Sequence, residues 1–208
     1  MSFAARGGLI CESENESERT EVSKLIVTEF VTLDGVMEAP GGEPTHPHTG
    51  WVLDFMSPEQ QQYKLNEALE AESHLLGRVT YESFAAAWPE RDGEFADKMN
   101  SMPKYVVSST LEDPLEWNNS TLIQGDVSEE VGKLKEQDGG PILVAGSATL
   151  VHSLIENDLV DELRLMVFPV VIGGGKRPFP ESQQRKPFKL TDTQTFGPGV
   201  AVHTYEPA

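Results

Sequence analysis

The chain has 208 residues, of which 38% are hydrophobic and 24% are charged, the balance of one globular domain with a substantial core. Its formal net charge of −18 disfavours binding to nucleic-acid phosphates or to an anionic membrane surface. A single cysteine, Cys11, excludes an internal disulfide and a cysteine zinc site within one chain. The sequence therefore predicts neither a nucleic-acid partner nor a metal centre.

The N-terminal segment differs in composition from the rest of the chain. Residues 11–21 are mostly Glu, Ser and Asn, which bury too little apolar surface to offset the entropy lost on ordering. We expect a mobile acidic extension over residues 1–22 and a folded domain over 23–208. The apolar stretch at 9–11 is too short for a secretory signal, and the longest apolar run, 165–172, is far below the roughly 20 residues of a membrane helix. We therefore expect a cytoplasmic protein.

Short apolar runs alternate with helical patterns along the domain. The predicted strands are 24–33, 73–76, 105–107, 121–123, 141–145, 163–172, 188–196 and 200–205. Helices are predicted over 58–71, after Thr80 as N-cap, around 95–102, after an Asp126 and Glu129 capping box, and after 146–147. Strands separated by helices predict an α/β fold with a mostly parallel sheet, helices on both faces and an antiparallel C-terminal hairpin joined at 197–199.

Small and hydroxyl-bearing residues follow three of these strands. The segments are Gly77 to Thr80, Ser108 to Thr110, and Gly146 to Thr149. Ligands of α/β sheets bind where the carboxyl ends of strands meet helix N-termini, because free N–H groups and the helix dipole favour anions there. Each segment alone is more often a plain turn or cap. Three together at successive strand ends favour a phosphate-rich ligand.

Several standard motifs are missing from the sequence. Residues 173–176 lack the earlier glycine of a P-loop, and neither a G-x-G-x-x-G fingerprint nor a G-x-S-x-G nucleophile elbow occurs. His46 and His48 lack an acidic partner at helical spacing, so they are expected to be solvated loop residues.

An ordered series of motifs between residues 24 and 206 resembles the dihydrofolate-reductase-like family that includes the reductase domain of bacterial riboflavin biosynthesis, the C-terminal domain of RibD. The motifs are Thr32-Leu33-Asp34-Gly35, Gly77-Arg78-Val79-Thr80-Tyr81-Glu82, Trp88-Pro89, Lys104-Tyr105-Val106-Val107-Ser108, Ile142-Leu143-Val144-Ala145-Gly146-Ser147, Leu159-Val160-Asp161-Glu162-Leu163 and Pro169-Val170-Val171-Ile172-Gly173-Gly174-Gly175-Lys176. The H-x-E and P-C-x-x-C motifs of the zinc deaminase domain in bifunctional members are not present, which predicts a stand-alone reductase.

The resemblance implies a sheet of about eight strands, NADPH as hydride donor, a small pyrimidine- or pterin-like substrate and a homodimer. The residues it implies for the cofactor are Gly77, Arg78, Thr80, Ser108, Ser109, Gly146, Ser147, Ala148 and Thr149. For the substrate it implies Leu33 and Gly35. Trp51, an aromatic residue that could form a wall for a planar substrate, and Gly174 are further candidates. Asp34 and Asp54 are the candidate catalytic acids, with water as the alternative proton source. A nucleotide-binding transferase, a dinucleotide-binding module without turnover and an acidic interaction protein remain open.

Overall fold

The computed structural model describes residues 22–137, 139–179, 181–182 and 184–208. Except for Val22, the predicted acidic extension lies outside the described residues. The strands are β1 (Leu25–Thr32), β2 (Ser73–Gly77), β3 (Lys104–Val107), β4 (Ser120–Ile123), β5 (Ile142–Val144), β6 (Glu162–Phe168), β7 (Phe188–Phe196) and β8 (Val200–Pro207). The helices are η1 (Leu53–Phe55), α1 (Pro58–Glu70), α2 (Arg78–Ala87), α3 (Glu94–Ser101), α4 (Val127–Lys135) and α5 (Ala148–Glu156). Among the residues that the structure describes, no helix is long and apolar enough to cross a bilayer.

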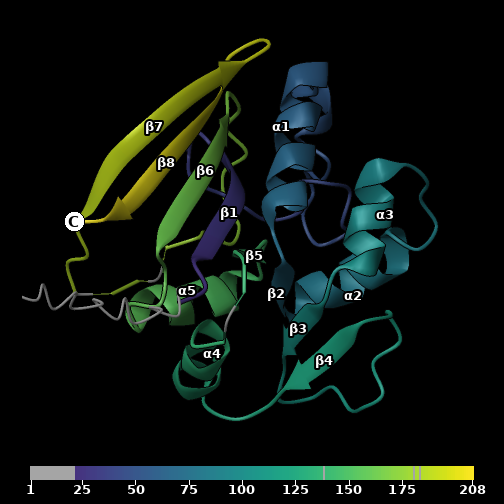
Figure 1. Ribbon diagram of the computed structural model, residues 1–208. Helices are drawn as coiled ribbons and strands as arrows, with labels where there is room; N and C mark the ends of the chain where they lie inside the picture. Colours follow the sequence, from purple (N-terminus) through teal and green to yellow (C-terminus); the bar gives the residue numbers. More distant parts are fainter. Residues whose placement is uncertain (1–21, 138, 180, 183) are drawn as a thin grey trace, which may run out of the picture.

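The strands form one sheet in the order β4-β3-β2-β5-β1-β6-β8-β7 (Figure 1). Strands β1 to β6 run parallel, and β8 pairs antiparallel with both β6 and β7. The predicted mostly parallel sheet with an antiparallel C-terminal hairpin is therefore confirmed. Because the parallel strands all point the same way, the turns that follow them gather along one edge of the sheet.

Strand β1 lies inside the sheet, between β5 and β6, and both of its faces are covered. Leu25 and Val27 pack in a cluster with residues of α4 and α5. Ile26, on the opposite face, packs with Ala71, which directly follows α1. Alternation of side chains along a strand explains why one apolar run serves two helical layers.

Two element boundaries differ from those predicted. Thr80 is the third residue of α2, and Gly77 is the N-cap, so the prediction of Thr80 as N-cap is wrong. The predicted strand 163–172 ends at Phe168, where the Val170 N–H turns back to the Phe168 carbonyl at 2.8 Å. Pro169 lacks a donor to continue the ladder, so the segment after it leaves the sheet.

The N-cap of α4 gives a local stability prediction. The Asp126 carboxylate accepts the Glu129 N–H at 3.0 Å, as the sequence predicts. We expect Asp126→Ala to lower the free energy of unfolding by about 1 kcal/mol, because one N–H at the helix start loses its acceptor. Urea denaturation measures the change. Asp92→Ala, at an exposed loop aspartate, is the matched control and should change stability by less than about 0.5 kcal/mol.

Candidate functional site

Two of the three predicted strand-end segments are in direct contact. Strand β2 lies beside β5, and the Gly77 N–H donates to the Gly146 carbonyl at 3.2 Å. A Cβ placed on Gly77 would lie 3.0 Å from Ser147 N, so the two turns touch backbone to backbone. This contact brings the N-termini of α2 and α5 to one place on the carboxyl edge.

The β5–α5 turn has the features of an anion-binding helix N-terminus. Gly146 has a φ of +83°, and Ser147 is the N-cap of α5 without a capping hydrogen bond from its side chain. The N–H groups in the first turn of α5 are therefore available to an external hydrogen-bond acceptor. Ala148 is buried and packs with Val31 and Met37, whereas the Thr149 side chain is exposed.

The β2–α2 turn adds a cation and a hydroxyl. Arg78 is the exposed first residue of α2, and its Nη1 pairs with Glu82 Oε2 at 2.9 Å. The Thr80 hydroxyl faces the neighbouring turn, since a Cβ on Gly146 would lie 2.8 Å from Thr80 Oγ1. A ligand phosphate at this junction would meet helix N–H groups and the Thr80 hydroxyl, with Arg78 as the first residue of the same helix as Thr80.

The third segment follows β3, the next strand beyond β2. Ser108 is 8% exposed, and its hydroxyl accepts the N–H groups of Thr110 at 3.1 Å and Leu111 at 3.0 Å. Ser108 therefore closes its own turn. Ser109 and Thr110 are exposed and carry the hydroxyls that a ligand would meet first.

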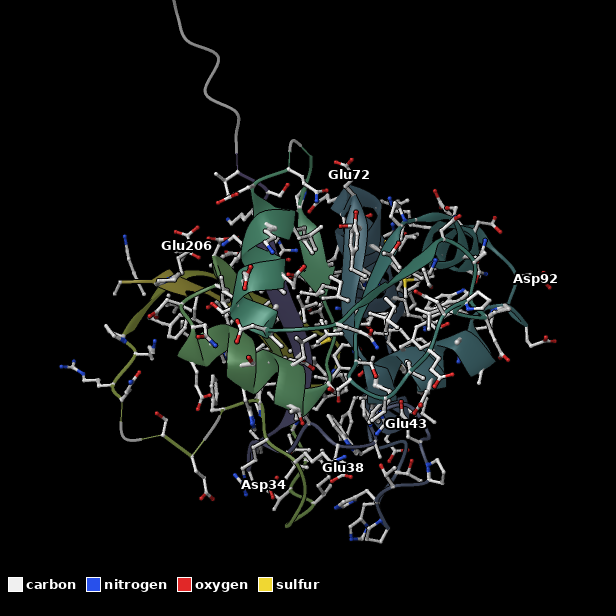
Figure 2. The ribbon with its side chains drawn as sticks, turned by 90° about the horizontal axis from the view of Figure 1, so that it is seen from below. Asp34, Glu38, Glu43, Glu72, Asp92 and Glu206 are labelled. Carbon is white, nitrogen blue, oxygen red and sulfur yellow. The ribbon has the colours of Figure 1, made fainter. Side chains whose placement is uncertain are left out.

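Asp34 joins the loops that follow β1 and β6. Its carboxylate accepts the Thr32 hydroxyl at 2.6 Å and the Gly173 N–H at 2.8 Å. The Thr32 hydroxyl lowers the pKa of Asp34 below its ordinary value, and backbone N–H groups of the loop after β6 add to this effect. Figure 2 shows Asp34, Glu38 and Glu43 at one end of the molecule and Glu72, which precedes β2, at the other. The hydrogen bonds to Asp34 thus hold its carboxylate in the ionised form.

The remaining predicted residues divide into exposed and buried positions. Leu33 is 63% exposed at the end of β1, Gly35 has a φ of +78°, and Asp54 is exposed on η1. Gly174 is exposed, and its carbonyl lies 2.7 Å from His46 Nε2.

Trp51 differs from these positions because only 5% of it is exposed. Its ring packs edge-on against Phe168 with centroids 5.3 Å apart, and its Nε1 donates to the Glu38 carbonyl. The structure thus places the Trp51 side chain in the core, below the loops that follow β1.

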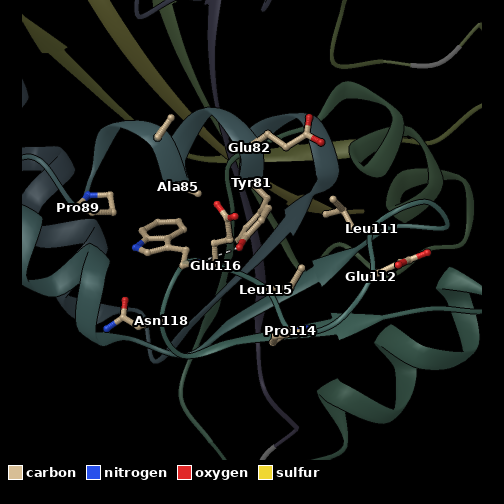
Figure 3. A pocket seen from close by; sticks show the side chains of 12 residues that line it. Tyr81, Glu82, Ala85, Pro89, Leu111, Glu112, Pro114, Leu115, Glu116 and Asn118 are labelled. Atoms are coloured by element: carbon tan, nitrogen blue, oxygen red, sulfur yellow. Dashed lines mark hydrogen bonds between the residues drawn. The ribbon is translucent and has the colours of Figure 1, made fainter.

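A hollow lies beside α2 rather than over the strand ends. Its volume is about 590 Å³, and Tyr81, Glu82, Glu112 and Glu116 contribute to its wall (Figure 3). Carboxylates around its wall make it a poor place for ligand phosphates. The phosphate-binding candidates therefore remain the turns at the carboxyl edge.

A buried residue next to these turns is missing from the predicted set. Glu29, in the middle of β1, is 7% exposed, and its Oε1 lies 3.9 Å from a Cβ placed on Gly146. The signal for it in the sequence is a carboxylate inside the mostly apolar run 25–32 of a central strand.

Comparison with known proteins places the chain in a family. The model of the RibD C-terminal domain matches residues 23–202. The chain belongs to the RibD C-terminal domain family. An uncharacterized Bacillus subtilis protein, YyaP, is 32% identical over 187 residues, which cover 88% of this chain and 94% of YyaP.

Solved structures of low sequence identity share the fold. A candidate riboflavin biosynthesis protein from Shewanella sp. PV-4 matches with a TM-score of 0.70 and 20% identity, covering 89% of this chain and 99% of that one. The Thermotoga maritima diaminohydroxyphosphoribosylaminopyrimidine deaminase/5-amino-6-(5-phosphoribosylamino)uracil reductase matches with a TM-score of 0.63 and 14% identity, over 91% of this chain and 58% of that protein. The resemblance seen in the motifs is thereby confirmed for family and fold.

Proposed function

We propose that the chain is an NADPH-dependent reductase that transfers hydride to a small heterocyclic substrate of the pyrimidine kind. The observation that carries the proposal is the contact between the Gly77 and Ser147 turns, which sets two helix N-termini and Arg78 side by side. Membership of the RibD C-terminal domain family supports the same activity, as does the reductase named in the Thermotoga protein.

The residues at the carboxyl edge fit a dinucleotide phosphate. A side chain on Gly146 would lie 2.8 Å from Thr80 Oγ1, so only glycine lets the β5–α5 turn pack this close to the Thr80 hydroxyl. We assign the pyrophosphate to the N-terminus of α5 and a 2′-phosphate to Arg78, whose planar cation suits a phosphate group. When bound, NADPH supplies the hydride.

The protein groups around the substrate would exclude water and supply a proton. Leu33 and Val171 are 63% and 67% exposed, and their adjacent loops are joined by the Leu33 N–H to the Val170 carbonyl. These apolar side chains are suited to cover a planar ring. Asp34 accepts hydrogen bonds and is held ionised, so we assign it to positioning the loops. Asp54 and water then remain as proton sources.

Titration with NADPH and NADH tests the proposal first, with cofactor fluorescence as the readout. We expect NADPH to bind more tightly than NADH. We also expect the absorbance of NADPH at 340 nm to fall when an amino-ribosylaminopyrimidine is added as substrate, tested with and without a 5′-phosphate. NADPH binding without consumption across a broad panel of heterocycles would favour the binding module. No NADPH binding at neutral pH would overturn the assignment.

A further inference from the structure

Glu29 is a buried carboxyl to which the proposed reductase function gives no role. It is 7% exposed, and its Oε1 is buried without a hydrogen-bond partner in the described part of the chain. A buried ionised carboxylate is stable only when cations or hydrogen-bond donors compensate it. The surroundings of Glu29 therefore decide which form the folded protein holds.

Glu29 faces the turn that we assign to the ligand phosphates. A Cβ on Gly146 would lie 3.9 Å from Glu29 Oε1 and 2.8 Å from Thr80 Oγ1, so both side chains border the same turn. On the same face of β1, Val31 packs with Ala148 in the first turn of α5. The Glu29 carboxyl thus lies directly behind the helix N-terminus where an anion would bind.

The cation that acts on the Glu29 carboxyl, the half-buried Lys64, already pairs with another carboxylate. On α1, Lys64 pairs with Glu67. On β6, Arg164 pairs with Glu162 and, at 3.3 Å, with Glu67 Oε1. Glu67 and Glu162 each contact a cation, Glu162 also through Lys24, whereas none of the ion pairs among the described residues includes Glu29. The α2 and α5 residues that border the turn, Thr80 and Ala148, carry no charge.

These surroundings favour the neutral acid. Burial raises the pKa of Glu29 to about 8, and Glu67 adds to the rise, while Lys64 and the Gly146 N–H act in the opposite direction. At neutral pH the side chain is therefore mostly protonated, and the space behind the α5 N-terminus holds no negative charge. Above pH 8 the Glu29 side chain would be mostly ionised, which places a negative charge behind the α5 N-terminus.

We propose that Glu29 is a positioning residue that acts through the Gly146 turn, and that dinucleotide phosphates bind at this turn only while Glu29 carries its proton. The inference rests on the proposed function, because it assigns the phosphates to the α5 N-terminus. A carboxylate behind the turn repels a phosphate in front of it with little water between them, whereas the acid does not. Glu29 thereby sets the pH range in which the cofactor binds.

The test measures the NADPH dissociation constant of the full chain between pH 7 and pH 9.5. We expect it to rise about tenfold between pH 7 and pH 9, as linkage to one proton requires. In Glu29→Gln an amide that does not titrate replaces the acid, so the dissociation constant should stay the same across this range. Glu162→Gln is the matched control: it removes another buried carboxylate, away from the turn, and should keep the slope of the unmodified protein.

Thermal melts of the unliganded proteins supply a second readout. The folded pKa of Glu29 lies above that of an unfolded glutamate, so its protonation stabilises the fold at low pH and this stabilisation is lost as pH rises through about 8. The melting temperature of Glu29→Gln relative to the unmodified protein should therefore increase from pH 5 to pH 8. A purely structural role for Glu29 would produce this shift without any pH slope in NADPH binding.

The possible outcomes separate the two proposals. If the unmodified protein binds NADPH but shows no slope, or if Glu29→Gln retains the slope, this inference is overturned and the reductase proposal stands. If the unmodified protein binds no NADPH at pH 7, the reductase proposal fails and this inference fails with it.

Discussion

Replacing Gly77 by alanine should weaken NADPH binding by about 100-fold, the scale of losing one hydrogen bond to a charged phosphate, about 1.5–3 kcal/mol. Gly77 has a φ of −77°, which any residue adopts, so the substitution causes no backbone strain. The added Cβ would lie 2.3 Å from Ser147 Oγ and 3.0 Å from Ser147 N. Because a backbone nitrogen cannot rotate away, the two turns must separate, with a loss of about 1–3 kcal/mol in stability.

A double variant tests this steric cause. Gly77→Ala with Ser147→Gly removes the Oγ and Cβ contacts and leaves only the contact to Ser147 N, so binding and stability should partly recover. Gly132→Ala is the matched control on α4, where a Cβ meets nothing within 4 Å, and it should raise stability by about 1 kcal/mol. Tight NADPH binding by Gly77→Ala alone would show that the contact between the turns does not shape the site.

Local signals in the sequence were sufficient where a single segment determines its own structure. Asp126 precedes α4 with a side chain that can accept a helix N–H, and the structure shows that hydrogen bond. The predicted N-cap of α2 failed because Gly77 fills the role through its extended backbone, held by a bond to the Gly146 carbonyl. That partner lies in the turn after β5, far along the chain, so no pattern near residue 80 records it.

The arrangement of the candidate site depends on strand order. The sequence locates the turns after β2, β3 and β5, but only the order β3-β2-β5 makes them neighbours, and that order comes from long-range pairing. The position of Trp51 has a similar cause, since Phe168, its packing partner, lies far along the chain. Glu29 was missed because the prediction treated the apolar run of β1 as plain core.

The Arg78 ion pair leads to the second large prediction, which concerns cofactor choice. In the structure the Arg78 guanidinium contacts both carboxylate oxygens of Glu82, at 3.0 and 2.9 Å. Both side chains are exposed, so the pair contributes only about 0.3–0.5 kcal/mol and does not prevent Arg78 from turning to a ligand. A dianionic 2′-phosphate should compete successfully with Glu82 for this cation.

Arg78→Ala should therefore weaken NADPH binding by about 1.5–3 kcal/mol, the contribution of a charge-assisted hydrogen bond, and leave NADH binding nearly unchanged. Glu82→Gln is the control: it removes the competing carboxylate while keeping the size of the side chain, so NADPH affinity should stay the same or rise slightly. Titrations of both cofactors against the three proteins measure these differences, and thermal melts check that each variant is folded. Only NADPH carries the 2′-phosphate. Equal losses of affinity for the two cofactors in Arg78→Ala would therefore show that Arg78 contacts a group that both carry, such as the pyrophosphate. That result would remove the basis for a preference for NADPH.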